Sequence, residues 1–131
     1  MCERGLNTLA PKSILLVDDD ESIATSLSLL LTMDNHRVEV VGDGETALIR
    51  YGERKFDLVI TDFQMVGMSG LELARLIKGH FPQQRIVLFT GQLEAVSENE
   101  KTGLEHVDAL LPKPFSQAQL YGALKAVFPH G

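Results

Sequence analysis

Carboxylates, a hydroxyl and an amine stand at or just after the ends of short apolar runs in this sequence. The residues are Asp18, Asp19, Asp62, Thr90 and Lys113. Carboxylates that share one site repel each other, so without a counter-charge the pKa of at least one would rise. A divalent cation removes this conflict, and a few carboxylates that leave room for water suit Mg²⁺ better than Ca²⁺. If the three aspartates meet in the fold, they predict a magnesium site.

The same side chains suit chemistry on a phosphoryl group. A metal ion, the Lys113 ammonium and the Thr90 hydroxyl can neutralise the phosphoryl oxygens while charge develops on them during transfer. A carboxylate in such a pocket can itself be the nucleophile and become an aspartyl phosphate. The residue types therefore predict phosphoryl transfer, provided that the fold brings the run ends together.

The apolar runs that precede these side chains have the length of β-strands. Most are continuous rather than alternating, as expected for a parallel sheet that is covered on both faces. The second run differs, because apolar and charged residues alternate in it, which suggests an edge strand. The runs are 14–17, 38–41, 58–60, 86–89 and 107–111.

Helical patterns lie between the runs. Apolar residues within 23–31 have the spacing of one helix face. Asp43, Ser69 and Ser116 precede further helical patterns and can cap them, the two serines as parts of capping boxes. A weaker pattern over 93–102 has few apolar positions and predicts a loosely held, mobile helix.

Strand and helix alternate five times, which predicts an open α/β fold, (βα)5, with right-handed crossovers and a parallel five-stranded sheet. Ligands of such sheets bind beyond the carboxyl ends of the strands, at the point where the strand order reverses. In the doubly wound order 2-1-3-4-5, the first and third strands are neighbours. Asp18, Asp19 and Asp62 would then converge in one crevice.

Length, charge and cysteine content limit the class of protein. The 131 residues predict one domain, placed at 13–128 between a flexible lead-in (1–12) and a short tail (129–131). A net charge of −6 without a basic run argues against a nucleic-acid surface. No apolar stretch reaches the ~20 residues of a membrane span, and the N-terminus lacks the apolar block of a signal peptide. One cysteine suits a reducing compartment, so the expected location is cytoplasmic.

Four segments, in this order and at this spacing, resemble the receiver domains of two-component response regulators. The segments are Leu15–Asp20, Asp57–Asp62 with the loop through Gly70, Val87–Gly91 and Lys113–Phe115. The resemblance covers about residues 12–128. It implies a flavodoxin-like doubly wound fold, in agreement with the alternation of strands and helices.

The resemblance also implies a set of metal ligands. Asp19 and Asp62 would bind Mg²⁺ through their carboxylates, and Gln64 would bind it through its backbone carbonyl. Asp18 would act mainly through a metal-bound water. These four residues are the metal site that we expect in this chain.

Further roles follow from the resemblance for the phosphoryl group. Asp62 would be the phosphoacceptor, Thr90 would reorient to hydrogen-bond the phosphoryl group, and Lys113 would pair with it. The bond between Lys113 and Pro114 is typically cis in this family, which helps to aim the lysine.

Some positions depart from the family pattern. Val66 replaces the usual proline after Met65, and Leu110 stands where many members have an aromatic switch residue. A rotamer switch driven by a ring hydroxyl is therefore not expected. Gln64 and Gln92 occupy the two positions whose side chains tune dephosphorylation in the family, and the sequence leaves open whether they steer or shield the attacking water.

The expected function is a phosphorylatable signalling switch and not a turnover enzyme. A sensor histidine kinase or a phosphotransfer protein would donate the phosphoryl group to Asp62. The phosphorylated domain would then bind an output protein that the sequence does not identify, through the face formed by the fourth and fifth helices and the fifth strand. A phosphorylation-dependent homodimer is a further expectation, whereas direct contact with nucleic acid or membrane is not expected.

Two other functions stay open at this point. A phosphohydrolase resembling the haloacid dehalogenases would use Asp18 and Asp20 as a DxD pair, with Thr90 and Lys113. It would leave Asp62 without a role, and no acid follows Asp108 to complete that site. A module that has lost phosphate chemistry is the other alternative, although all the reactive residues are present.

The remaining polar residues have structural interpretations. Asp20 is expected to open a helix, because acids favour helix N-termini. Met33, Met65 and Met68 are expected to make packing or loop contacts rather than to bind metal. The histidines lie near predicted element ends and are expected at the surface: His36, His80, His106 and His130.

Overall fold

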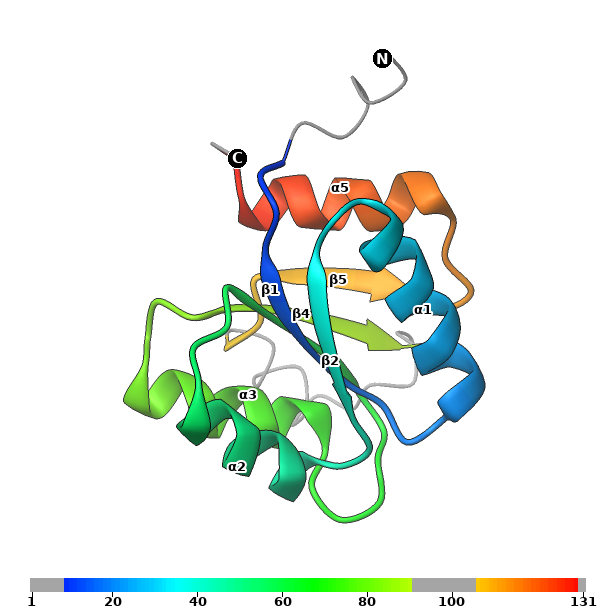
Figure 1. The fold of residues 1–131 in the computed structure, drawn as a ribbon. Coiled ribbons are helices and arrows are strands. Elements are labelled where there is room, and N and C mark those ends of the chain that lie inside the picture. The colour runs from blue at the N-terminus through cyan, green and yellow to red at the C-terminus, as the bar shows by residue number, and fades with distance from the viewer. Residues whose placement is uncertain (1–8, 91–105, 130–131) are drawn as a thin grey trace.

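The protein was analysed as a computed structural model, which describes residues 9–90 and 106–129 (Figure 1). The strands are β1 (Ser13–Val17), β2 (Arg37–Val41), β3 (Leu58–Asp62), β4 (Arg85–Thr90) and β5 (Ala109–Pro112). The described helices are α1 (Glu21–Met33), α2 (Gly44–Glu53), α3 (Gly70–His80) and α5 (Gln117–Val127). The helix predicted over 93–102 and the residue Gln92 lie outside the described part of the chain.

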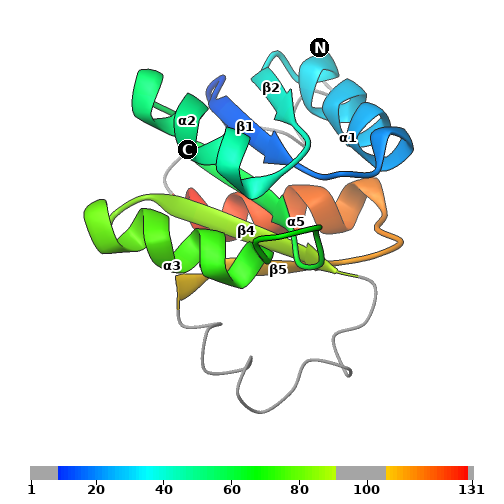
Figure 2. The ribbon, with the colours of Figure 1, turned by 90° about the horizontal axis from the view of Figure 1, so that it is seen from below.

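The five strands form one parallel sheet in the order β2-β1-β3-β4-β5, as predicted. β1 pairs with both β2 and β3, so the first and third strands are neighbours, and β2 is an edge strand as its alternation suggested. Helices α1 and α5 cover one face of the sheet, and α2 and α3 cover the other (Figures 1 and 2). No helix in the described residues is long and apolar enough to cross a membrane.

Each face of the sheet has its own apolar core. Side chains of β1 alternate between the two cores: Leu16 packs with residues of α1 and α5, whereas Leu15 and Val17 pack with residues of α2 and α3. All three are fully buried. A strand buried on both faces needs apolar residues at consecutive positions, which explains the continuous runs in the sequence.

The helices begin where the capping residues predict. The Asp20 carboxylate accepts hydrogen bonds from the first turn of α1, and Asp43 caps α2. Ser116 and Gln119 form both hydrogen bonds of a capping box at the start of α5. Ser69 caps α3 by accepting from the Glu72 backbone N–H at 3.1 Å, which is one half of the box that the sequence suggested.

The fifth strand was predicted over 107–111, but in the structure it runs from Ala109 to Pro112. Val107, at the start of the predicted run, packs against apolar side chains below the sheet instead of pairing with β4. An apolar residue next to a strand fills a core gap as readily as a residue within it, so hydrophobicity alone does not fix the strand start.

The prediction that all four histidines lie at the surface is wrong for His36, which is only 3% exposed. His36 follows the turn after α1, and its Nδ1 accepts a hydrogen bond from the Lys12 backbone N–H at 3.0 Å. Burial lowers the pKa of His36, since the charged imidazolium loses its hydration. Its Nε2 is buried and has no hydrogen-bond partner.

The two ends of the described fold meet at the amino-terminal edge of the sheet. The Lys12 ammonium lies 4.4 Å from the centre of the Phe128 ring, which follows α5. Leu9 also packs against the core on the α1 and α5 face. Figure 1 shows the start of β1 and the end of α5 on this side of the molecule, away from the carboxyl ends of the strands.

Candidate functional site

The carboxyl ends of the strands bring the predicted residues to one edge of the sheet. Asp18 and Asp19 follow β1, Asp62 ends the neighbouring β3, and Thr90 ends β4. Lys113 follows β5, and its backbone N–H donates to the Thr90 carbonyl at 2.9 Å. Because parallel strands all point the same way, residues far apart in sequence meet at this edge.

The three aspartates form a compact cluster. Each offers a carboxylate oxygen, and these oxygens lie within 4.8 Å of one another. Asp18 and Asp62 are buried, at 2% and 7% exposure, whereas Asp19 is exposed. Carboxylates so close together satisfy the first condition for a magnesium site.

Asp18 shows the cost of gathering these charges. Its pKa is raised to about 6, mainly by burial and also by the neighbouring Asp62. The Asp20 backbone N–H, which donates to Asp18 Oδ1 at 2.9 Å, and the Lys113 charge act in the opposite direction. The other oxygen, Oδ2, is buried without a hydrogen-bond partner. An unsatisfied buried oxygen beside two further carboxylates fits a hard divalent cation.

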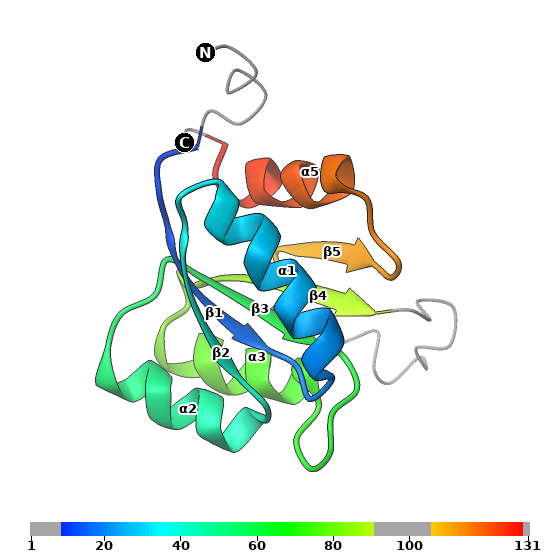
Figure 3. The ribbon, with the colours of Figure 1, turned by 45° about the vertical axis from the view of Figure 1, so that its right-hand side comes forward.

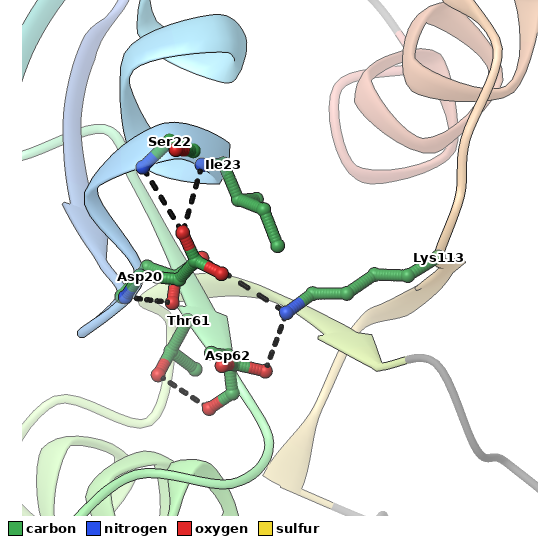
Figure 4. A network of polar contacts seen from close by, with 7 residues as sticks. Asp20, Ser22, Ile23, Thr61, Asp62 and Lys113 are labelled. Carbon is green, nitrogen blue, oxygen red and sulfur yellow. Dashed lines mark hydrogen bonds and ion pairs between the residues drawn. The ribbon is translucent and has the colours of Figure 1, made fainter.

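Lys113 supplies the cation on the other side of the cluster (Figure 4). Its Nζ lies 3.1 Å from Asp62 Oδ1 and 3.9 Å from Asp18 Oδ2. The same ammonium lies 4.5 Å from the centre of the buried Phe89 ring, a contact that the sequence analysis did not anticipate. The bond between Lys113 and Pro114 is cis, as the family resemblance implied.

Thr90 and Gln64 lie in different surroundings at this edge of the sheet. Thr90 is 4% exposed and lies on β4, which pairs with both β3 and β5 between Asp62 and Lys113. Gln64 is exposed in the loop after β3, two positions beyond Asp62. The bonding of its carbonyl to a metal stays a prediction.

The backbone beneath Asp62 depends on a glycine to which the sequence analysis gave no role. A Cβ at Gly70 would overlap the Asp62 carbonyl oxygen and approach Leu88 Cδ1 to 2.9 Å. The Gly70 N–H donates to the Phe63 carbonyl at 2.9 Å, so α3 begins directly against the strand end. The only sequence signal for this contact is a glycine at the start of a helical pattern, where one is seldom needed.

Chemically, the site combines a buried carboxylate, an ammonium in contact with it, a hydroxyl on the adjacent strand and a cluster of acids suited to Mg²⁺. This arrangement can bind and neutralise a phosphoryl group at Asp62. Figure 4 shows Lys113 reaching Asp62 from the opposite side of the pocket to Asp20, whose side chain caps α1.

Comparison with known proteins places this geometry in a family. The sequence pattern of the response regulator receiver domain matches residues 14–125. The sensory transduction protein RegX3 of Mycolicibacterium smegmatis is 30% identical over 120 residues, which make up 91% of this chain and 51% of RegX3. The DNA-binding response regulator MtrA of Mycobacterium tuberculosis is 33% identical over 114 residues, or 86% of this chain and 49% of MtrA. The chain thus spans about half the length of these curated relatives.

A solved structure gives the same result. The response regulator protein TrrA of Thermotoga maritima, in complex with Mg²⁺ and BeF, is 30% identical and superposes with a TM-score of 0.81 over 88% of this chain and 98% of TrrA. The chain belongs to the response regulator receiver domain family and is a receiver domain of two-component signalling.

Proposed function

We propose that this domain accepts a phosphoryl group on Asp62 in a Mg²⁺-dependent reaction and thereby switches its binding to other proteins. The observation that carries the proposal is the contact of 3.1 Å between Lys113 Nζ and Asp62 Oδ1, beside two further carboxylates. A lysine already in contact with the acceptor oxygen is placed to neutralise a phosphoryl group attached there.

The transfer is a nucleophilic displacement at phosphorus. A carboxylate oxygen of Asp62 forms a bond to the phosphorus of a phosphohistidine, and the phosphorus–nitrogen bond breaks. Its electron pair returns to the imidazole, which leaves as the neutral ring after taking up a proton. Hydrolysis later adds water to the phosphorus and restores the Asp62 carboxylate and inorganic phosphate. The domain catalyses both steps on itself, so it does not turn over a separate substrate.

The chain's own residues would hold Mg²⁺ in this proposal. Asp19 and Asp62 would bind it through their carboxylates, Gln64 would bind it through its backbone carbonyl, and Asp18 would act through an intervening water. When bound, Mg²⁺ supplies positive charge that neutralises carboxylate and phosphoryl oxygens. The buried Oδ2 of Asp18, which has no hydrogen bond and only a distant ion pair with Lys113 at 3.9 Å, supports this assignment, since a cation nearby would compensate its charge.

In this proposal, Thr90 and Lys113 change their contacts when Asp62 carries a phosphoryl group, and these changes transmit the phosphorylation state to the rest of the domain. The Thr90 hydroxyl turns to donate to a phosphoryl oxygen, and Lys113 shifts its ion pair from the carboxylate to the phosphoryl group. Leu110 is 39% exposed and carries no ring hydroxyl, so an aromatic switch does not contribute. The signal passes instead through the backbone of β4 and β5, which pair at Thr90 and Pro112.

The phosphodonor would be a histidine kinase or a phosphotransfer protein, the class of partner with which receiver domains interact. A cavity of about 510 Å³ beside Lys113 supports this part of the proposal. It lies between α1 and the segment after β5, and its apolar lining includes Ile23, Leu30 and Phe115. A donor helix that packs there would place its histidine next to the aspartate cluster.

The output would be a second protein or a second copy of the phosphorylated domain. MtrA is named as DNA-binding, but this chain spans only about half of MtrA. The net charge of −6 makes direct binding of DNA by the receiver domain itself unfavourable. A cytoplasmic location is also part of this proposal, and the single cysteine is compatible with it.

The phosphohydrolase alternative is weakened by the position of Asp20. Its carboxylate accepts hydrogen bonds from the Ser22 and Ile23 backbone N–H groups and caps α1, as Figure 4 shows. In a DxD hydrolase site this acid would face the substrate instead. Asp62, which that chemistry does not use, is the carboxylate in closest contact with Lys113.

The test is intact-mass spectrometry after incubation with acetyl phosphate, with and without Mg²⁺. We expect the wild type to gain one phosphoryl group only when Mg²⁺ is present, because the carboxylate cluster needs the cation. Asp62→Ala removes the nucleophile and should gain none, whereas Asp34→Ala, at the far end of α1, should behave like the wild type. Labelling of Asp62→Ala at another residue would overturn the assignment.

A wild type without an adduct would have two explanations that beryllofluoride separates. Beryllofluoride mimics the phosphoryl group but is not hydrolysed. A stable complex that depends on Asp62 would indicate rapid hydrolysis of the natural adduct, and would support the proposal. Failure to form the complex would favour a module that has lost phosphate chemistry.

A further inference from the structure

A second cavity lies at the edge of the sheet opposite to the aspartate cluster. It has a volume of about 670 Å³ and is formed where α2 ends and where α3 leads into β4. Figure 3 shows the C-terminal ends of these two helices on the same side of the molecule, away from the ends of the strand arrows. The volume falls within the ~300–1,000 Å³ of pockets that bind small molecules.

Aromatic rings form one wall of this cavity. Phe81 is 56% exposed, and its ring meets that of Tyr51 edge-on at 5.4 Å between centres. Tyr51 in turn stacks on the buried Phe56 at 6.5 Å. The Tyr51 hydroxyl donates to Gln84 Oε1 at 2.7 Å, which fixes the ring. Three of the eight aromatic residues in the chain therefore line one cavity, and one of them presents its ring to solvent.

The charges around the cavity are unevenly matched. Among its acids, Asp57 accepts from the Ser13 backbone N–H at 2.8 Å and Glu53 pairs with Arg50 at 3.4 Å. The cations Lys55 and Arg85 are exposed and have no ion pair with any residue that the structure describes. In a chain of net charge −6, this cavity thus combines available positive charge with an aromatic surface.

We propose that this cavity binds a nucleoside monophosphate, with the base stacked against Phe81 and the phosphate near Lys55 and Arg85. Bases stack on aromatic side chains whatever their identity, because every base has a π-face. Lysine and arginine are the usual partners of phosphate. A ligand that is planar at one end and anionic at the other matches both features at once, whereas an inorganic anion or an uncharged ring matches only one.

The experiment is a titration of ¹⁵N-labelled protein with AMP, followed by NMR. EDTA is present, so that no metal at the aspartate cluster can bring AMP to the phosphorylation site. We expect saturable shifts in the amides of 51–57 and 81–85, with a dissociation constant of about 1 mM or below. Adenosine alone and inorganic phosphate alone should each bind more weakly than AMP.

Variants at the cavity test the assignment of each part. Phe81→Ala should weaken AMP binding about tenfold, and Arg85→Gln should weaken it about threefold. The matched controls are Leu29→Ala, another exposed apolar side chain, and Arg75→Gln, another exposed arginine, and both should bind AMP like the wild type. Because Phe81 and Arg85 are exposed, neither variant leaves a hole in the buried core, although Phe81→Ala also removes the ring contact with Tyr51.

Several results would overturn the proposal. One is AMP binding that Phe81→Ala leaves unchanged, and another is inorganic phosphate that binds as tightly as AMP. Shifts centred on Lys113, and lost in Lys113→Ala, would instead indicate anion binding at the phosphorylation site. Binding of an acidic, aromatic-containing peptide without binding of AMP would make the cavity a protein contact and would equally contradict a nucleotide site.

Discussion

Asp18 carries the main electrostatic conflict of the site at the scale of single residues. A carboxylate that is 2% exposed, with one oxygen that accepts no hydrogen bond, destabilises the protein while it is charged. Either a proton or a cation relieves this cost, and the two compete for the same group. Its pKa of about 6 means that the competition falls close to physiological pH.

We therefore expect Mg²⁺ to bind more weakly as the pH falls through about 6, since protonated Asp18 no longer attracts the cation. Below that pH the dissociation constant should rise by up to about tenfold per pH unit. Calorimetric titration with Mg²⁺ at about pH 7.5 and about pH 5 measures the change. Asp18→Asn should abolish this pH dependence, whereas Asp19→Asn should weaken binding and retain it. A pH dependence that survives in Asp18→Asn would assign it to another group.

The reactive residues were predictable because each stands at a strand end, where the chain direction of a parallel sheet fixes its position. This applies to Asp18, Asp62 and Lys113. The sequence predicted that these residues lie at one edge of the sheet, but it did not predict the distances between their side chains. The contact of Lys113 with Phe89 was not predicted, because a pattern of burial does not say which side chain lies beneath another.

At the scale of secondary-structure elements, the closest link to the site is the start of α3. Gly70 allows this helix to begin against the Asp62 carbonyl, which also accepts a hydrogen bond from Thr61 Oγ1 at 3.0 Å. A shift of the Asp62 backbone would therefore displace the start of α3. Gly67, in the loop between them, has a φ of 86°, a conformation that favours glycine.

Gly70→Ala should consequently damage both stability and chemistry. Its new methyl group would overlap the Asp62 carbonyl, so we expect a loss of about 1–3 kcal/mol in the free energy of unfolding and slower labelling by acetyl phosphate. Urea unfolding and the time course of the mass adduct measure the two effects. The matched control is Gly122→Ala in the exposed middle of α5, where an added Cβ would meet no atom beyond its own helix backbone and chain neighbours within 4 Å. This variant should gain up to about 1 kcal/mol in the free energy of unfolding. Equal effects of the two substitutions would contradict this role for Gly70.

The elements in the described part of the chain were predicted by type and order, and the errors lie at their ends. β3 extends to Asp62 rather than stopping at Ile60, and β5 begins two residues later than expected. Strand ends depend on pairing with the neighbouring strand, and Asp62 is included because it pairs with Phe89. Such pairing is not encoded in the apolar run of either strand alone.

For the molecule as a whole, the burial of His36 is expected to make the free energy of unfolding depend on pH. Its burial was missed because the residue follows a helix end, where most polar residues are solvated. The neutral ring accepts from Lys12 N–H, and protonation would place a second donor against that group. Burial is the main cause of the lowered pKa and the Lys12 charge adds to it, whereas Asp34 acts in the opposite direction.

We expect this histidine to reduce the free energy of unfolding as the pH falls below about 6.5, the unfolded value. In that range the unfolded chain binds a proton that the folded chain does not, so stability falls until the lower folded pKa is reached. The slope is at most about 1.4 kcal/mol per pH unit. Urea unfolding of the wild type and of His36→Asn across this range isolates the effect, because Asp18 contributes equally to both. Parallel curves for the two proteins would show that His36 does not titrate on unfolding.

The contact between Lys12 and Phe128 has a consequence for how this domain can be joined to others. A fold whose ends meet is nearly a closed ring, and folds of this kind tolerate circular permutation and insertion into another protein. Because the ends lie at the amino-terminal edge of the sheet, a fused module is attached opposite to Asp62. The aspartate cluster thus stays uncovered whichever end carries the fusion, and a module joined at either end would leave the proposed function of this edge intact.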